Sequence, residues 1–182
     1  TKAYYHLIST QAKSRNHILE AKDTNILKSV RYYSQNKFNP YKLAWSLVYA
    51  SEINSEKIGN DSLSLKYIRK AASIAEENEL SNEILNMYIY NFWGNILYGK
   101  RPYQDAIDKY LVANRYAQSI NDTAQIISGI INIGSLFLSN HEYGTGRNYL
   151  ERAINLITVY PEKARRLPHI YERISILLYG GR

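Results

Sequence analysis

Apolar and polar residues recur along the chain with the three-to-four-residue period of amphipathic helices. Segments of about 12 to 18 residues carry this period and are separated by short polar turns. No segment sustains the two-residue alternation that is typical of a half-buried strand. The pattern therefore predicts an all-α protein of eight or nine helices.

Two kinds of residue mark the expected helix starts. An aspartate before a helix can accept hydrogen bonds from the free amides of the first turn, and a glutamine three residues later completes a capping box. Proline suits a helix entry because the first turn does not need its missing amide proton. Capping is expected at Asp23, Asp61 and Asp122, the last with Gln125, and proline entries or breaks at Asn39–Pro40, Arg101–Pro102, Tyr160–Pro161 and Pro168.

Small residues recur at fixed distances, which indicates internal repeats. Gly94 is followed at offsets of 12, 16 and 19 by Ala106, Tyr110 and Ala113. Gly134 is followed at the same offsets by Gly146, Leu150 and Ala153. A weaker copy runs from Ser51 through Ser64, Ile68 and Ala71 at offsets of 13, 17 and 20, so one residue is inserted in the turn, and Ser175 aligns as a last anchor.

These small residues have a physical purpose at helix crossings. Two antiparallel helices approach to about 8 to 10 Å only where the side chains between them are minimal. We therefore expect Gly94 to cross close to Ala106, and Gly134 close to Gly146. Successive pairs stack to bury their apolar stripes. The expected architecture is a right-handed α–α superhelix, a single domain with segments at 1–38, 41–78, 84–119, 123–158 and 163–182.

The pattern of small residues and their spacing resemble those of the long-period tetratricopeptide repeat (TPR) proteins abundant in Bacteroides and relatives. The resemblance rests on the offsets above and on the order of four segments, AYYHLISTQAKSRN, DTNILKSVRYYSQ, KLAWSLVYASEI and SLKYIRKAASIAEEN. The anchors lie 43, 40 and 41 residues apart, a period that HEAT and armadillo arrays share, and such arrays are the structural alternative. The resemblance implies partner binding in sensing or assembly, in a periplasmic or membrane-anchored lipoprotein, with a cytoplasmic location as the alternative.

One side of each first helix in a pair is expected to face the concave surface, which solenoids use for binding. At 100° per residue, positions six and three before the anchor and one and four after it share one arc. The residues expected there are Tyr88, Asn91, Asn95 and Tyr98, then Ser128, Ile131, Ser135 and Leu138, then His169, Glu172, Ile176 and Tyr179. Trp45, Val48, Glu52 and Ser55 take these positions in the weaker repeat, and packing between successive helices is the alternative role for all of them.

The amino-acid composition excludes several kinds of functional site. The chain has no cysteine, so thiolate metal sites and cysteine nucleophiles are excluded. Its four histidines lack the spacing of a helical zinc site, and we expect no metal and no cofactor. Gly144–Thr145–Gly146 reads as a turn entering a helix, and Asp105 with Asp108 as solvated charge. The longest apolar runs fall short of the roughly 18 to 20 residues of a membrane span.

The formal net charge of +7 would attract anionic partners. Basic pairs such as Arg69–Lys70 stand near acids such as Glu76, which indicates a solvated mixed surface. We expect a protein or peptide partner and no enzymatic activity. The alternatives are a ligand-sensing regulatory domain, nucleic-acid binding, and carbohydrate binding.

Overall fold

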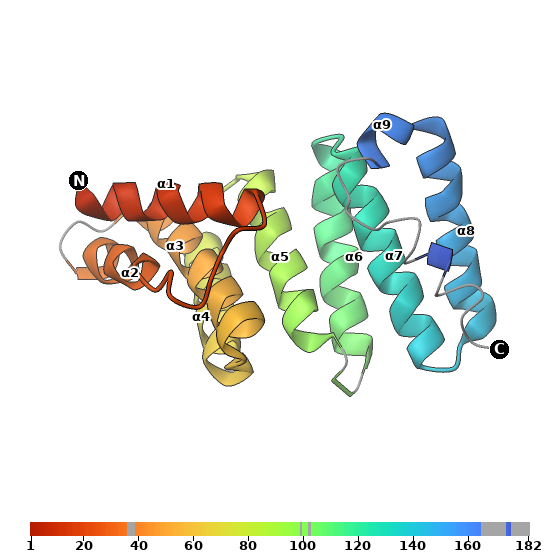
Figure 1. The fold of residues 1–182 in the computed structure, drawn as a ribbon, viewed down its shortest axis with the longest axis horizontal. Coiled ribbons are helices and arrows are strands. Elements are labelled where there is room, and N and C mark those ends of the chain that lie inside the picture. The colour runs from red at the N-terminus through yellow and green to blue at the C-terminus, as the bar shows by residue number, and fades with distance from the viewer. Residues whose placement is uncertain (36–38, 99, 102, 165–173, 176–182) are drawn as a thin grey trace. The chain divides into compact units, whose positions relative to one another are not determined.

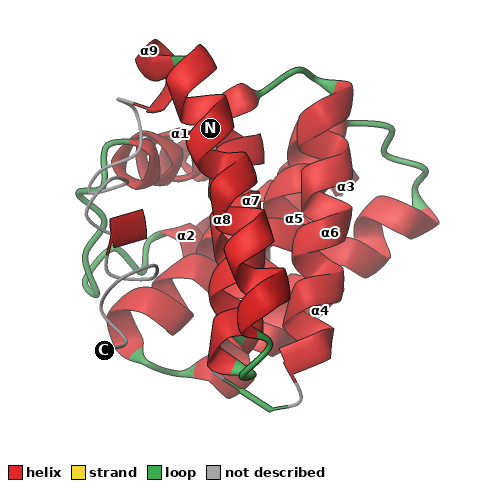
Figure 2. Cartoon of the chain, turned by 90° about the vertical axis from the view of Figure 1, so that its right-hand side faces the viewer, coloured by secondary structure: helices red, strands yellow, loops and turns green. Residues whose placement is uncertain are grey.

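Every regular element of the described chain is a helix. The computed structural model describes residues 1–35, 39–98, 100–101, 103–164 and 174–175, and Figures 1 and 2 show helices joined by loops in this part of the protein. The all-α prediction is confirmed. The helices are α1 (Lys2–Arg15), α2 (Ile26–Gln35), α3 (Pro40–Glu52), α4 (Asp61–Glu77), α5 (Glu83–Leu97), α6 (Tyr103–Ser119), α7 (Thr123–Ser139), α8 (Tyr143–Val159) and α9 (Pro161–Ala164), with a π-helical turn η1 (Ile53–Ile58) after α3.

Helices that follow one another in sequence pack against one another. In one compact unit, Thr1–Ile96, α1 packs on α2, α2 on α3, and α3 on α4. In the other, Leu97–Arg182, α6 packs on α7 and α7 on α8. The boundary falls inside α5, within the segment expected to form the 84–119 repeat. The segments at 41–78 and 123–158 each contain one packed helix pair.

α3 is the centre of the first unit. Every residue from 43 to 54 is buried, as expected for a helix that is covered on all sides. α1, α2, α4 and η1 pack around it. Leu85 and Ile89 of α5 belong to the same apolar core.

α7 has the corresponding place in the second unit. Ile127, Ile130 and Ile131 pack with Leu150, Ala153 and Ile157 of α8. Ile133 and Leu136 pack with Ala106, Ile107 and Tyr110 of α6. α7 therefore lies between its two sequence neighbours, and two small apolar clusters hold the helices together.

The expected close crossing of Gly134 and Gly146 is present. A Cβ atom built on Gly134 would lie 3.1 Å from the carbonyl oxygen of Gly146, and one built on Gly146 would lie 2.9 Å from the carbonyl oxygen of Gly134. Both positions therefore bring backbone against backbone. Gly94 and Ala106 are both buried but belong to different units, and their contact stays a prediction.

Ser51 and Ser64 form the corresponding crossing of α3 and α4. Their hydroxyl oxygens lie 2.8 Å apart, and each also lies within hydrogen-bonding distance of the other residue's carbonyl oxygen, at 3.0 Å for Ser51 and 2.7 Å for Ser64. Each hydroxyl has one proton and donates it to one of these acceptors. Both side chains are fully buried. The crossing uses hydrogen bonds between small polar side chains where the second unit uses two glycines.

Removing either hydroxyl should weaken this crossing. We expect Ser64→Ala to lower the free energy of unfolding by about 1 kcal/mol, because one buried hydrogen bond to a backbone carbonyl is lost. Urea denaturation of the variant and the wild type measures the difference. Ser62→Ala, on the exposed side of the same helix, is the control, and equal midpoints for the two variants would contradict the expectation.

The residue inserted in this repeat is accommodated by η1. A π-helical turn closes its hydrogen bonds over five residues where an α-helical turn closes them over four, so it takes up one additional residue. η1 is followed by its C-cap Gly59, whose φ of 75° lies in the left-handed region that glycine adopts without strain.

The helix starts confirm some of the predicted caps and correct others. Asn39 caps α3 with Pro40 in the first turn, Asp122 accepts from the amide of Gln125 at 3.2 Å, and α9 begins at Pro161. The prediction for Asp61 is wrong, because Asn60 accepts from the amide of Leu63 and Asp61 is already helical. The prediction for Asp23 is also wrong, because its carboxylate binds Lys13 and the amide of Glu20 while α2 begins at Ile26. Pro102 and Pro168 lie outside the described residues.

Candidate functional site

The expected binding residues of α5 lie along its less buried side. Asn82 starts the helix by accepting from the amide of Leu85 at 2.8 Å. Asn91 is then half-buried, Asn95 is exposed, and Tyr98, directly after the helix, keeps 39% of its surface exposed. Asn95 and Tyr98 therefore each expose part of their side chain to solvent.

Tyr88 mostly packs inside the protein. Its ring centroid lies 5.3 Å from that of Trp45 and 6.1 Å from that of Phe92, and the side chain lies against the core of the first unit. Trp45 and Tyr88 are the equivalent positions of two successive repeats. Their contact is what the packing alternative predicts for this face.

The expected residues of α7 are more enclosed. Ile131 and Ser135 are buried, and the Ser135 hydroxyl donates to the carbonyl oxygen of Ile131 at 2.7 Å. Such side chains offer no contact surface, so we leave both out of the proposed binding face. Ser128 and Leu138 are half-buried, and Leu138 lies over Gly146. His169, Glu172, Ile176 and Tyr179 lie outside the described residues.

A buried carboxylate between α1 and α3 was not anticipated. Glu52, expected on the concave face, is only 7% exposed, and the Ser14 hydroxyl of α1 lies 2.8 Å from each of its carboxylate oxygens. The pKa of Glu52 is raised to about 7, mainly by burial and also by the nearby Glu56, although the Ser14 hydrogen bond and Lys57 act in the opposite direction. A glutamate inside the apolar run from Leu43 to Ile53 was the only sequence signal for this site.

Tyr49 stands one helical turn before Glu52 and is also buried. Its ring stacks on that of Trp45, with centroids 5.6 Å apart. Burial raises the pKa of its hydroxyl, and the neighbouring Tyr88 raises the pKa further. The charge of Glu52 also raises this pKa, so the tyrosine hydroxyl lies near the carboxylate that Ser14 binds.

The other residues considered as candidate sites form isolated interactions in the described part of the chain. No group of three or more metal-ligating side chains is present among the described residues, and none of the helices described is long and apolar enough to span a bilayer. His141 is hydrogen-bonded to Tyr143 at 2.9 Å, and Asp108 accepts from Gln104 at 2.7 Å. Gly144 and Gly146 lie in the first turn of α8, as the reading of a turn entering a helix requires.

Comparisons of the chain with models of protein families, with curated proteins and with solved structures found no match.

Proposed function

We propose that the protein is a binding scaffold of the tetratricopeptide type, a right-handed superhelix of helix pairs that holds a peptide segment of a partner protein on its concave face. The scaffold acts by binding, without catalysis. The paired helices supply a rigid frame, and side chains of the first helix in a pair supply the contacts.

The support for this proposal is the pairing of consecutive helices around small residues. Gly134 against Gly146 and Ser51 against Ser64 occupy equivalent places in two helix pairs, one in each unit. A structure built from such units grows by stacking, and its inner surface is extended. Extended surfaces suit peptide segments better than small molecules, which prefer enclosed pockets.

The side chains of α5 fit peptide recognition. Asn91 and Asn95 are one helical turn apart, so their amides are neighbours along the helix. An asparagine amide both donates and accepts, and it can therefore pair with the N–H and C=O of an extended peptide.

Selection of peptides from a displayed library tests the proposal. We expect selected peptides to bind the wild type, and the double variant Asn91→Ala/Asn95→Ala to bind them at least about tenfold more weakly, which is the loss of roughly 1.4 kcal/mol. Fluorescence anisotropy with labelled peptides measures the dissociation constants.

The matched control is Asn148→Ala/Asn155→Ala, which removes two exposed amides from α8. Thermal melting of both variants checks that the fold is retained. Equal affinity of the α5 variant, the control and the wild type for every selected peptide would overturn the role of α5.

A further inference from the structure

The positive charge of the protein is concentrated at its N-terminal end. The first 50 residues contain eight basic and two acidic residues, whereas the remaining 132 contain 15 basic and 14 acidic residues. The interleaving of charges expected from the sequence therefore holds only after residue 50. The basic residues of the first part are Lys2, Lys13, Arg15, Lys22, Lys28, Arg31, Lys37 and Lys42.

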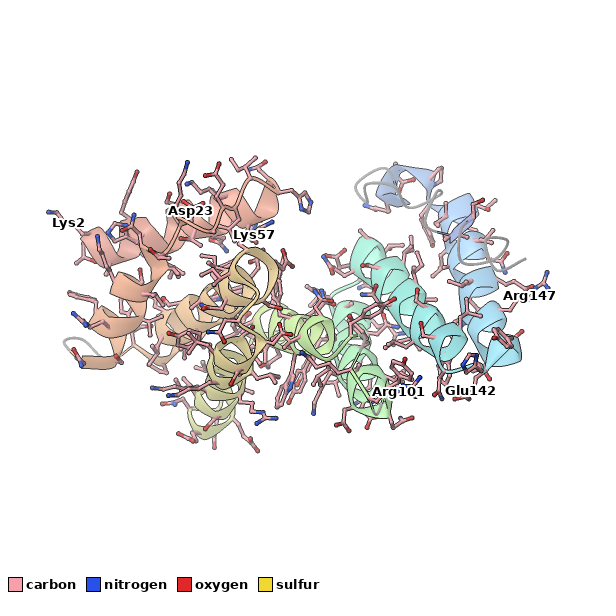
Figure 3. The ribbon with its side chains drawn as sticks, turned by 60° about the horizontal axis from the view of Figure 1, so that its bottom comes forward. Lys2, Asp23, Lys57, Arg101, Glu142 and Arg147 are labelled. Carbon is pink, nitrogen blue, oxygen red and sulfur yellow. The ribbon has the colours of Figure 1, made fainter. Side chains whose placement is uncertain are left out.

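The two acids of this region are already engaged. Asp23 forms an ion pair with Lys13, and Glu20 forms one with Lys22 at 2.6 Å. α1 and α2 contain no acidic residue at all. Figure 3 shows Asp23 in the connection after α1 and Lys2 at the start of that helix. Lys28 and Arg31 on α2 thus face solvent without a carboxylate on their own helix.

A hollow of about 410 Å³ is lined by residues of α2 and of the turn before it. Its lining joins two exposed cations to an apolar and an aromatic side chain. Leu27 exposes 38% of its surface, and Tyr32 is half-buried against the core of the first unit. The lining residues are Thr24, Leu27, Lys28, Arg31 and Tyr32.

We propose that this hollow is a docking surface for an acidic segment of a partner protein. Carboxylates of that segment pair with Lys28 and Arg31, and an apolar side chain between them packs on Leu27 and Tyr32. Charge complementarity carries the choice of partner, because the surrounding region has a large excess of positive charge and its acids are occupied. The surface is separate from the face of α5 and does not depend on it.

The size of the hollow favours a peptide over a nucleic acid. From Leu27 to Arg31 the helix advances about 6 Å, and two cations line this length. A nucleic acid presents phosphates continuously and is best matched by a longer basic track. Leu27 is exposed beside the cations. It can pack against an aliphatic side chain of a peptide, whereas a phosphate offers it no apolar surface.

Charge reversal on α2 tests the proposal. The probe is a fluorescein-labelled peptide of about twelve residues with alternating glutamate and leucine, a length that spans a short docking site. We expect Lys28→Glu/Arg31→Glu to weaken its binding at least about tenfold, and added salt to weaken binding to the wild type. Leu27→Ala should weaken binding while leaving its salt dependence unchanged.

The matched control is Lys66→Glu/Arg69→Glu on α4. It has the same residue spacing, the same change of net charge and exposed positions in the same unit. We expect it to bind as the wild type does. Equal loss in both variants would mean general attraction rather than a site and would overturn the proposal.

Two further probes and one further variant separate the remaining explanations. Equal binding of a peptide with glutamine in place of glutamate would overturn the role of charge. Tighter binding of a thymidine oligonucleotide of similar length would indicate a nucleic-acid surface, and binding of no probe would also overturn the proposal. Asn91→Ala/Asn95→Ala should bind the acidic peptide normally, so that failure here and failure of the α5 surface are distinguishable.

Discussion

Gly146→Ala should lower the free energy of unfolding by about 1 to 3 kcal/mol, the usual cost of forcing extra volume into a packed interior. The added Cβ would lie 2.7 Å from Cδ2 of Leu138 and 2.9 Å from the carbonyl oxygen of Gly134. Leu138 can rotate away, but the backbone oxygen can move only if α7 and α8 separate. Urea denaturation monitored by circular dichroism measures the loss.

Gly144→Ala is the control for this prediction. Gly144 lies in the same first turn of α8, and a Cβ there would meet no atom within 4 Å. Alanine has the higher helix propensity, so this variant should keep the stability of the wild type or raise it by up to about 1 kcal/mol. Equal destabilisation by the two substitutions would show that the close crossing does not hold α7 against α8.

Glu52→Gln should change how stability depends on pH. The pKa of Glu52 is about 7 in the folded protein against 4.5 for the unfolded reference, so the folded state holds its proton more tightly. The resulting stability is complete below pH 4.5 and is lost as the pH rises to about 7, by about 3 kcal/mol in total. Glutamine does not titrate, so the variant lacks this pH-dependent loss of stability. The free energy of unfolding of the variant minus that of the wild type should therefore be larger above pH 7 than at pH 4.5.

Unfolding measured at several pH values checks this expectation through the difference between wild type and variant, which cancels the titration of other groups. Glu76→Gln, at an exposed position of α4, is the matched control and should follow the wild type at every pH. A constant difference between wild type and Glu52→Gln would mean that the carboxylate is not held in its protonated form.

The sequence was most informative where local chemistry alone decides the structure. Amphipathic periods predicted the helices, and the offset of 12 placed Gly146 opposite Gly134 because backbone contact needs two small residues at one crossing. The offset of 13 after Ser51 also indicated an insertion, although the pattern could not show that η1 would take it up within the helix.

Properties that depend on neighbouring helices were harder to predict from the sequence. Asn95 on α5 and the buried Ile131 and Ser135 on α7 occupy equivalent arcs of their helices, and helical periodicity cannot tell an open face from one covered by another helix. The burial of Glu52 depends on α1, which is 38 residues away at Ser14. Asn60 replaced Asp61 as a cap because helix starts are uncertain by one or two residues when both neighbours can accept the hydrogen bond.

The π-helical turn η1 allows the number of residues in a repeat to change without changing how its two helices cross. Because the wider turn takes up the additional residue after Ser51, the hydroxyls of Ser51 and Ser64 still meet. A chain that can store an insertion in this way can vary its repeat period while the contact between helices is conserved. Differences in period among helix pairs are therefore a poor guide to differences in their packing.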